Sequence, residues 1–133
     1  MKKRFVAIFL TMLISSISVV PVAAASIMPF WVNVKRISLS LTFSSGQANA
    51  SGIVEGESNT TRISATYSLQ EKNGNNWTTV HTWPTVTIYG KLLTFTGSAS
   101  ATQGKTYRLT VNATVTNTAG TSETVSEYLE KTY

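Results

Sequence analysis

The sequence predicts an all-β fold, a sandwich of seven antiparallel strands that follows an N-terminal signal peptide. Apolar and polar residues alternate with a period of two over several segments, and no segment after residue 25 has a convincing helical period. Turn-forming residues separate these segments at spacings that suit two packed sheets. The composition of the first 25 residues is different and predicts export from the cell.

Residues 1–25 have the three parts of a secretory signal peptide. Lys2-Lys3-Arg4 is a charged start, Phe5–Ile14 is an unbroken apolar run, and Ala23-Ala24-Ala25 is a small-x-small cleavage signal. The alternative is a permanent anchor, because the uncharged stretch is about the ~20 residues needed to span a bilayer. Serines and a proline dilute its second half, which favours cleavage. We therefore expect one secreted domain at 26–133, which meets the membrane only transiently through its signal peptide.

Charge and composition exclude several classes of function. The chain has 11 Lys and Arg residues against 6 acidic residues, all of them Glu, for a net charge of +5. Cleavage would remove Lys2, Lys3 and Arg4 and lower the net charge to +2. The remaining basic residues are scattered, so we expect no nucleic-acid partner, which would require a basic stripe. There is no cysteine, so neither a disulfide nor thiolate chemistry is available.

Seven strands are expected in chain order, and three of them alternate strictly over their length. These three would be apolar on one face and rich in hydroxyl groups on the other. Asn73-Gly74 predicts a hairpin turn, Pro84 ends a strand, and Asn117 through Gly120 forms the last turn. The expected strands cover approximately residues 37–43, 47–55, 62–70, 77–83, 86–95, 107–116 and 121–129.

Two late segments resemble a known family. Gly104-Lys105-Thr106-Tyr107-Arg108-Leu109-Thr110-Val111-Asn112-Ala113, followed by Asn117-Thr118-Ala119-Gly120-Thr121-Ser122-Glu123, is similar to the late-strand signature of fibronectin type III domains. The resemblance implies an immunoglobulin/fibronectin type III-like sandwich in which Tyr107 is a tyrosine corner, its hydroxyl bonded back to the preceding turn. The whole chain also resembles small uncharacterised exported proteins of Gram-positive bacteria, with the same Leu-Gln…Asn-Gly…Trp-Thr-x-Val core.

The fourth expected strand carries the candidate binding residues. On a regular strand Trp77, His81 and Trp83 share one face. If that face is outward, the indoles stand about 20 Å apart at ~3.3 Å per residue and form a platform for sugar rings. If it is inward, both indoles fill the core, whereas a β-bulge would bury one indole with Val80 and free the other. Burial of at least one indole is favoured, because two fully exposed tryptophans are unusual.

The remaining polar groups indicate little chemistry. Thr114-x-Thr116-x-Thr118 could order water or bind ice, but sheets twist, and the repeat is not expected to recur at matching positions on neighbouring strands. Glu55 and Glu57 are too few to bind Ca²⁺ well and are interpreted as a solvated loop. Glu123 and the two glutamates after it are interpreted as a charged edge strand. No cofactor, metal site or catalytic residue is expected.

We therefore expect a secreted, monomeric, non-enzymatic domain that binds an unknown extracellular ligand, a glycan or a protein, through Trp77, His81 and Trp83. The alternative is a small exported antibacterial or host-directed effector, which would expose an apolar patch of a few hundred Å². A lectin-like module would instead show polar groups beside a solitary aromatic side chain. An enzyme is the third possibility and would require His81, the only histidine, within hydrogen-bond reach of two glutamates.

Overall fold

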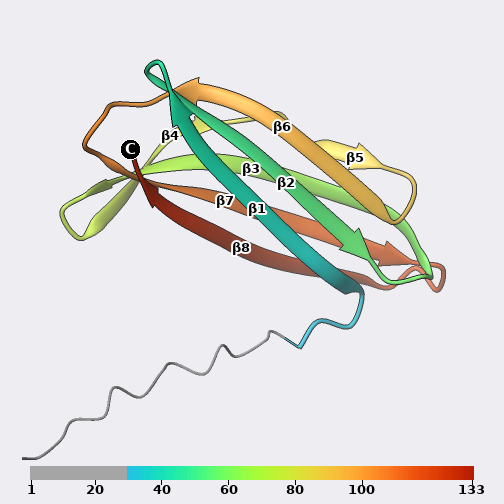
Figure 1. Ribbon diagram of the computed structural model, residues 1–133. Coiled ribbons are helices and arrows are strands. Elements are labelled where there is room, and N and C mark those ends of the chain that lie inside the picture. The colour runs from blue at the N-terminus through green and yellow to red at the C-terminus, as the bar shows by residue number, and fades with distance from the viewer. Residues whose placement is uncertain (1–29) are drawn as a thin grey trace, which may run out of the picture.

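The computed structural model describes residues 30–133, and the predicted signal peptide at 1–25 lies outside the described residues. Within 30–133 the chain forms eight strands and no helix. The strands build two antiparallel sheets, the arrangement of a β-sandwich (Figure 1). The all-β prediction is therefore confirmed. The strands are β1 (Val34–Ser44), β2 (Gln47–Gly56), β3 (Thr60–Asn73), β4 (Asn76–Thr82), β5 (Val86–Ile88), β6 (Leu92–Ser100), β7 (Thr106–Asn117) and β8 (Ser122–Thr132).

Sheet A has the strand order β1-β2-β6, and sheet B has the order β4-β3-β7-β8, with the short β5 paired to β3. Along the long strands buried and accessible residues alternate, as the period-two pattern predicts. The inward residues of both sheets form one hydrophobic core, and removing their side chains from water is the main stabilising contribution to the fold. The largest fully buried side chains are Tyr67, Tyr107, Leu41, Ile63, Leu69, Leu93, Leu109, Val54, Val111 and Val115.

The number of strands differs by one from the seven predicted. The segment 86–95, expected as a single strand, contains both β5 and β6. β5 pairs with β3 in sheet B, whereas β6 pairs with β2 in sheet A, so the chain changes sheets between them. The change occurs at Gly90, which has a φ of 155° that favours glycine, and its amide donates to the Thr61 carbonyl. Both halves are extended, so alternation alone did not separate them.

The turns follow the sequence signals closely. Asn73 and Asn76 pair at the start of the β3–β4 hairpin, and Gly74 adopts a φ of 62°. The side-chain oxygen of Asn117 accepts hydrogen bonds from the amides of Ala119 and Thr121 in the β7–β8 turn. These local bonds satisfy backbone groups that the sheet ladder leaves free.

Tyr107 ties β7 to the turn before it. Its side chain is buried, and its hydroxyl accepts a hydrogen bond of 2.7 Å from the Thr102 amide. The predicted bond from this hydroxyl to the preceding turn is therefore present. It fixes the entry of the chain into β7, the strand at the centre of sheet B.

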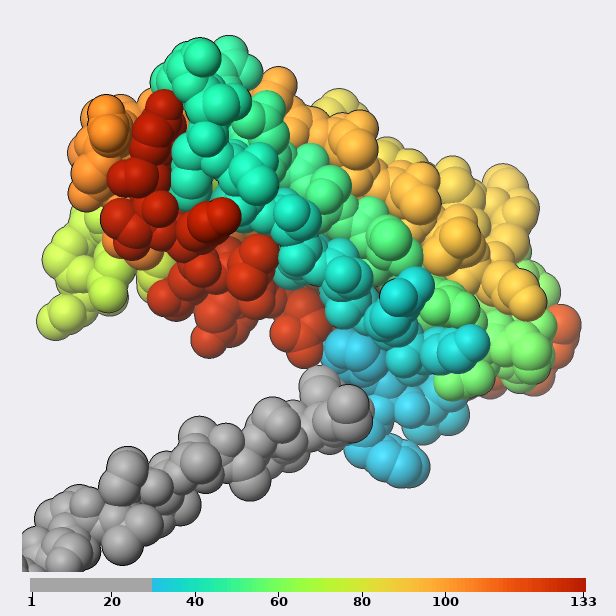
Figure 2. Space-filling model, in the orientation of Figure 1, coloured from blue at the N-terminus to red at the C-terminus, as the bar shows by residue number. Residues whose placement is uncertain are grey.

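Both ends of the described chain are fastened to a neighbouring strand. The Glu123 carboxylate accepts hydrogen bonds from the amides of Val32 and Asn33, the latter at 2.7 Å. At the other end the Tyr133 ring stacks on Phe43 of β1 with centroids 4.9 Å apart, and Figure 2 shows the C-terminal residues against β1. β8 lies at the edge of sheet B, as its glutamates suggested. Glu123 has a further role that the edge-strand interpretation did not include, because its carboxylate holds the two residues that precede β1.

Candidate functional site

The predicted platform of Trp77, His81 and Trp83 is divided by a β-bulge in β4. Gln70 of β3 pairs with Thr79 and Leu69 pairs with His81, which leaves Val80 without a partner. One extra residue reverses which face the following side chains take. Trp77 therefore lies on the outer face of sheet B, whereas His81 and Trp83 follow the inward register.

Trp83 is a core residue rather than part of an open surface. It is 8% exposed, packs edge-on against Phe95 with centroids 5.3 Å apart, and donates its indole N–H to the Ser98 carbonyl at 3.4 Å. His81 is exposed and lies against the Trp83 ring at 4.9 Å. The bulge thus buries one indole, as one alternative held, but Val80 remains 44% exposed, which that alternative did not expect.

Trp77 belongs to a different group of side chains, which we call the arginine cluster: Trp77, Arg108, Tyr128 and Gln70. The Arg108 guanidinium carbon lies 4.4 Å from the centroid of the Trp77 ring and 5.4 Å from that of Tyr128. The Arg108 Nε donates a hydrogen bond to the side-chain oxygen of Gln70. Four strands, β3, β4, β7 and β8, therefore contribute one residue each to one cluster.

The cluster has both accessible and shielded parts. Tyr128 is 59% exposed, whereas Trp77 and Arg108 are half-buried. A depression of about 440 Å³ lies next to Arg108 and Tyr128 and continues over Thr110, Asn112 and Ser126. An aromatic ring and a fixed cation thus border a depression that is lined by neutral hydrogen-bonding groups and, at one position, by Glu127.

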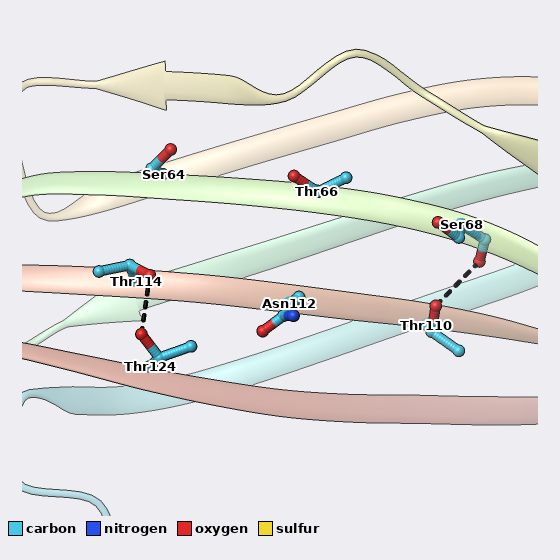
Figure 3. Close-up of a pocket in the computed structure, with 7 residues that line it drawn as sticks. All are labelled: Ser64, Thr66, Ser68, Thr110, Asn112, Thr114 and Thr124. Carbon is cyan, nitrogen blue, oxygen red and sulfur yellow. Dashed lines mark hydrogen bonds between the residues drawn. The ribbon is translucent and has the colours of Figure 1, made fainter.

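Hydroxyl and amide groups cover the rest of this outer face, which we call the hydroxyl face. Figure 3 shows part of it, with side chains from β3, β7 and β8 arranged across neighbouring strands. The strand register places these residues in rows: Thr87, Ser64, Thr114 and Thr124; then Thr85, Thr66, Asn112 and Ser126; then Thr82, Ser68, Thr110 and Tyr128. Of the threonine repeat, Thr114 faces Ser64 and Thr124, whereas Thr116 faces Arg62 and Ser122, so the rows contain hydroxyl groups of several residue types rather than a recurring threonine repeat.

Many of these hydroxyls bond to one another across the strands. Thr114 and Thr124 are 2.9 Å apart, Ser64 and Thr87 are also 2.9 Å apart, and Ser126 donates to the Asn112 side-chain oxygen at 3.1 Å. Such pairs hold the side chains in defined rotamers. A ligand would therefore meet a preorganised polar surface, and each hydroxyl keeps lone pairs for a further bond.

The outer face of sheet A provides a contrast. It also carries rows of small polar residues, and a second depression of about 440 Å³ is lined by Ser40, Thr42, Asn49, Ser51, Thr96, Ser98 and two small residues. No aromatic or charged side chain lines that depression. The arginine cluster therefore distinguishes sheet B from sheet A.

Across 30–133, no three His, Asp or Glu side chains are grouped so that they could hold a metal ion. Glu55, considered above for Ca²⁺, instead forms ion pairs with Lys35 at 3.2 Å and Arg36 at 3.3 Å. These neighbours lower the pKa of Glu55, with the hydrogen bond from Lys35 as the largest cause. In the same part of the chain no helix is long and apolar enough to cross a membrane.

The arginine cluster escaped sequence reasoning almost entirely. Trp77 was singled out by residue type. Arg108 and Tyr128 lie on the polar faces of β7 and β8, and Gln70 lies on the polar face of β3, and none of these three strands has an unusual sequence pattern. Only the register between strands brings them together. No protein-family model matches the sequence, and no curated protein is significantly similar to it. The function is therefore argued from the geometry of this face.

Proposed function

We propose that the protein is a secreted, monomeric, non-enzymatic module that binds glycans through the outer face of sheet B. The observation that carries this proposal is the exposed Tyr128 ring beside Arg108, at one end of a surface rich in hydroxyl and amide groups. Sugars present the same two features to a protein, apolar ring faces and many hydroxyl groups.

Each part of the surface has a role in this proposal. A sugar ring stacks on the accessible face of Tyr128, as ring C–H groups meet aromatic faces favourably. Its hydroxyls bond to Thr110, Asn112 and Ser126 in the adjoining depression. The rows of hydroxyls beyond the depression extend this surface along β3 and β7, which suits a polymer chain better than a single sugar.

We further infer that the sandwich is of the fibronectin type III kind. The order β1-β2-β6 facing β4-β3-β7-β8 supports this, as does the buried Tyr107 hydroxyl bonded to Thr102 five residues upstream. Domains of this shape are common binding modules, although the fold alone does not define a ligand. The ligand is therefore inferred from the face and not from the fold.

The alternative, an exported antibacterial or host-directed effector, has weaker support. Its expected sign was a patch of exposed apolar side chains. The exposed large apolar residues come from the N-terminal segment, β4, the β5–β6 link, the start of β6 and β8. They are Phe30, Val32, Val80, Tyr89, Leu92 and Tyr128. Only Phe30 and Val32 share a segment, and the six do not form one face of a sheet.

Binding of the purified protein to a panel of immobilised glycans and bacterial cell-wall polysaccharides tests the proposal. Tyr128→Ala should abolish the binding seen for the unaltered protein, because it removes the stacking surface. Tyr89→Ala is the matched control, since Tyr89 is 86% exposed and outside the hydroxyl face. Equal loss in both variants, or no glycan bound by the unaltered protein, would refute the proposed function.

A further inference from the structure

The Arg108 guanidinium is held in one position without an opposing charge. Trp77 and Tyr128 contact it at 4.4 and 5.4 Å, and its Nε donates to Gln70. The three ion pairs found within 30–133 join Lys35 and Arg36 to Glu55 and Lys105 to Glu71, and none includes Arg108. Its terminal N–H groups are therefore available to a ligand.

Positive charges outnumber negative ones on this face of sheet B. Counted by strand register, its charged residues are Arg62 and Lys72 of β3, Arg108 of β7 and Glu130 of β8. Glu130 lies opposite Arg108 in the β7–β8 register, but its carboxylate is not within ion-pair distance of the guanidinium. Arg108 is the only one of the three cations that borders the depression. Glu127 also lines it, but follows the inward register of β8, opposite the buried Val111, rather than the register of Arg108 and Tyr128.

We propose that Arg108 binds the carboxylate of an acidic polysaccharide, so that the ligand of this face is a chain containing uronic acid residues. This inference rests on the proposed function and specifies its ligand. A planar guanidinium offers two parallel N–H groups that match the two oxygens of a carboxylate. The flanking rings exclude water from its faces, and the fixed Nε leaves the terminal nitrogens for the ligand.

The hydroxyl face explains why a sugar acid fits better than a free carboxylate. Thr110 and Asn112 lie next to Arg108 in the same depression and can bond the sugar hydroxyls beside the acid group. Tyr128 lies opposite Thr110 in the β7–β8 register and supplies the stacking surface beside the guanidinium. One sugar residue can thus engage the cation, the ring and the neutral groups together.

Polygalacturonate and the same polymer with its carboxyl groups reduced to alcohols are the probes. The unaltered protein should bind polygalacturonate about ten to a hundred times more tightly than it binds the reduced polymer, as expected for charge-assisted hydrogen bonds. Arg108→Gln should remove this preference. Arg108→Lys should also lose most of it, because an ammonium group keeps the charge but not the paired geometry.

Arg62→Gln is the matched control for charge. Arg62 lies on the same strand face, eight residues from Gln70 along β3, or about 26 Å at ~3.3 Å per residue. Because a polymer lying along β3 would also reach Arg62, this control is measured with a short fragment of two galacturonate residues. Arg62→Gln should change the affinity for this fragment less than about twofold, because charges beyond the Debye length of about 8 Å are screened at physiological salt. Gln70→Ala retains the positive charges of Arg62 and Arg108. It removes the hydrogen-bond acceptor of the Arg108 Nε, so the guanidinium is no longer held in one position, and it should weaken binding to polygalacturonate several-fold.

The outcomes separate this inference from the proposed function. Equal affinity of the unaltered protein for the acidic and the reduced polymer overturns the carboxylate inference but leaves glycan binding intact. Equal losses in Arg62→Gln and Arg108→Gln also overturn it, since attraction would then be nonspecific. Failure to bind either polymer or any glycan of the panel overturns both. Thermal melting of each variant shows whether a loss of binding is caused by unfolding. If Arg108→Gln is unfolded, Gln70→Ala, which keeps the charge of Arg108, takes its place, and unchanged affinity of Gln70→Ala for polygalacturonate then overturns the carboxylate inference.

Discussion

Trp83→Ala should strongly destabilise the fold, whereas Trp77→Ala should not. A buried tryptophan removes about 150–250 Å² from water. At about 25 cal/mol per Å² this corresponds to at most about 4–6 kcal/mol. Measured Trp→Ala substitutions in protein cores cost about 3–5 kcal/mol, and Trp83, at 8% exposed, belongs to that class. Trp77 is half-buried at the surface, so its loss should cost about 1–2 kcal/mol.

Gly97 provides an independent test of the same packing. A methyl group at Gly97 would lie 2.6 Å from the Trp83 Nε1 and 2.8 Å from the Phe95 ring, too close for either to remain in place. Gly97→Ala should therefore cost about 1–3 kcal/mol. In the Trp83→Ala background the same change should cost less, because the methyl group then enters the space left by the indole.

Urea unfolding followed by far-ultraviolet circular dichroism measures these differences without relying on the tryptophans that are removed. A loss below 1 kcal/mol for Trp83→Ala, or a larger loss for Trp77→Ala than for Trp83→Ala, would refute the assignment of Trp83 to the core. Additive effects of Gly97→Ala and Trp83→Ala would refute their contact. The result also decides which tryptophan is suitable for binding experiments, because only Trp77 can be removed without disturbing the core.

Three further predictions concern the side chains of Tyr107, Tyr67 and Glu123. Tyr107→Phe should cost about 1 kcal/mol, because the Thr102 amide loses its acceptor. Tyr67→Phe should leave stability unchanged or raise it, because the buried Tyr67 hydroxyl has no hydrogen-bond partner within the described part of the chain. Urea unfolding of Tyr107→Phe and Tyr67→Phe compares the two, and a greater loss of stability for Tyr67→Phe would contradict this prediction. Burial raises the pKa of Tyr67 from 10.0 to about 12. The neutral hydroxyl is thus favoured in the folded state, so its contribution to stability is complete below pH 10 and is lost as the pH rises towards 12. Unfolding measured over this pH range should show the unaltered protein losing stability relative to Tyr67→Phe. Glu123→Gln should speed amide hydrogen exchange at Val32 and Asn33 with little change in the core, and unchanged exchange there would show that the carboxylate does not hold the start of β1.

The strands and their inward faces were largely predictable. The residues Ile63, Ala65, Tyr67 and Leu69 alternate with polar residues in the sequence, and all four are buried in β3. This succeeds because side-chain direction along a strand is a local property with a period of two. The Asn73-Gly74 turn was predictable for the same reason, since its backbone conformation depends on those residues themselves.

Local alternation fails where the strand is interrupted. Val80 looks like any other residue of its strand, yet as the unpaired residue of a bulge it places Trp77 and Trp83 on different faces. Gly90 lies within an apparently continuous strand, yet the chain leaves sheet B for sheet A there. Both features depend on which strand pairs on either side, and that pairing is set by hydrogen bonds between residues distant in the sequence.

The sequence by itself determined that this is a β-domain with apolar inner and hydroxyl-rich outer faces, because the alternation of apolar and polar residues is a property of neighbouring positions along the chain. The tertiary structure alone decided the arginine cluster. Trp77, Arg108 and Tyr128 come from three strands and meet only through the registers of β3 with β4, β3 with β7 and β7 with β8. A one-residue slip in any of these registers would turn a member of the cluster to the opposite face, so the site exists only once the sheet is assembled.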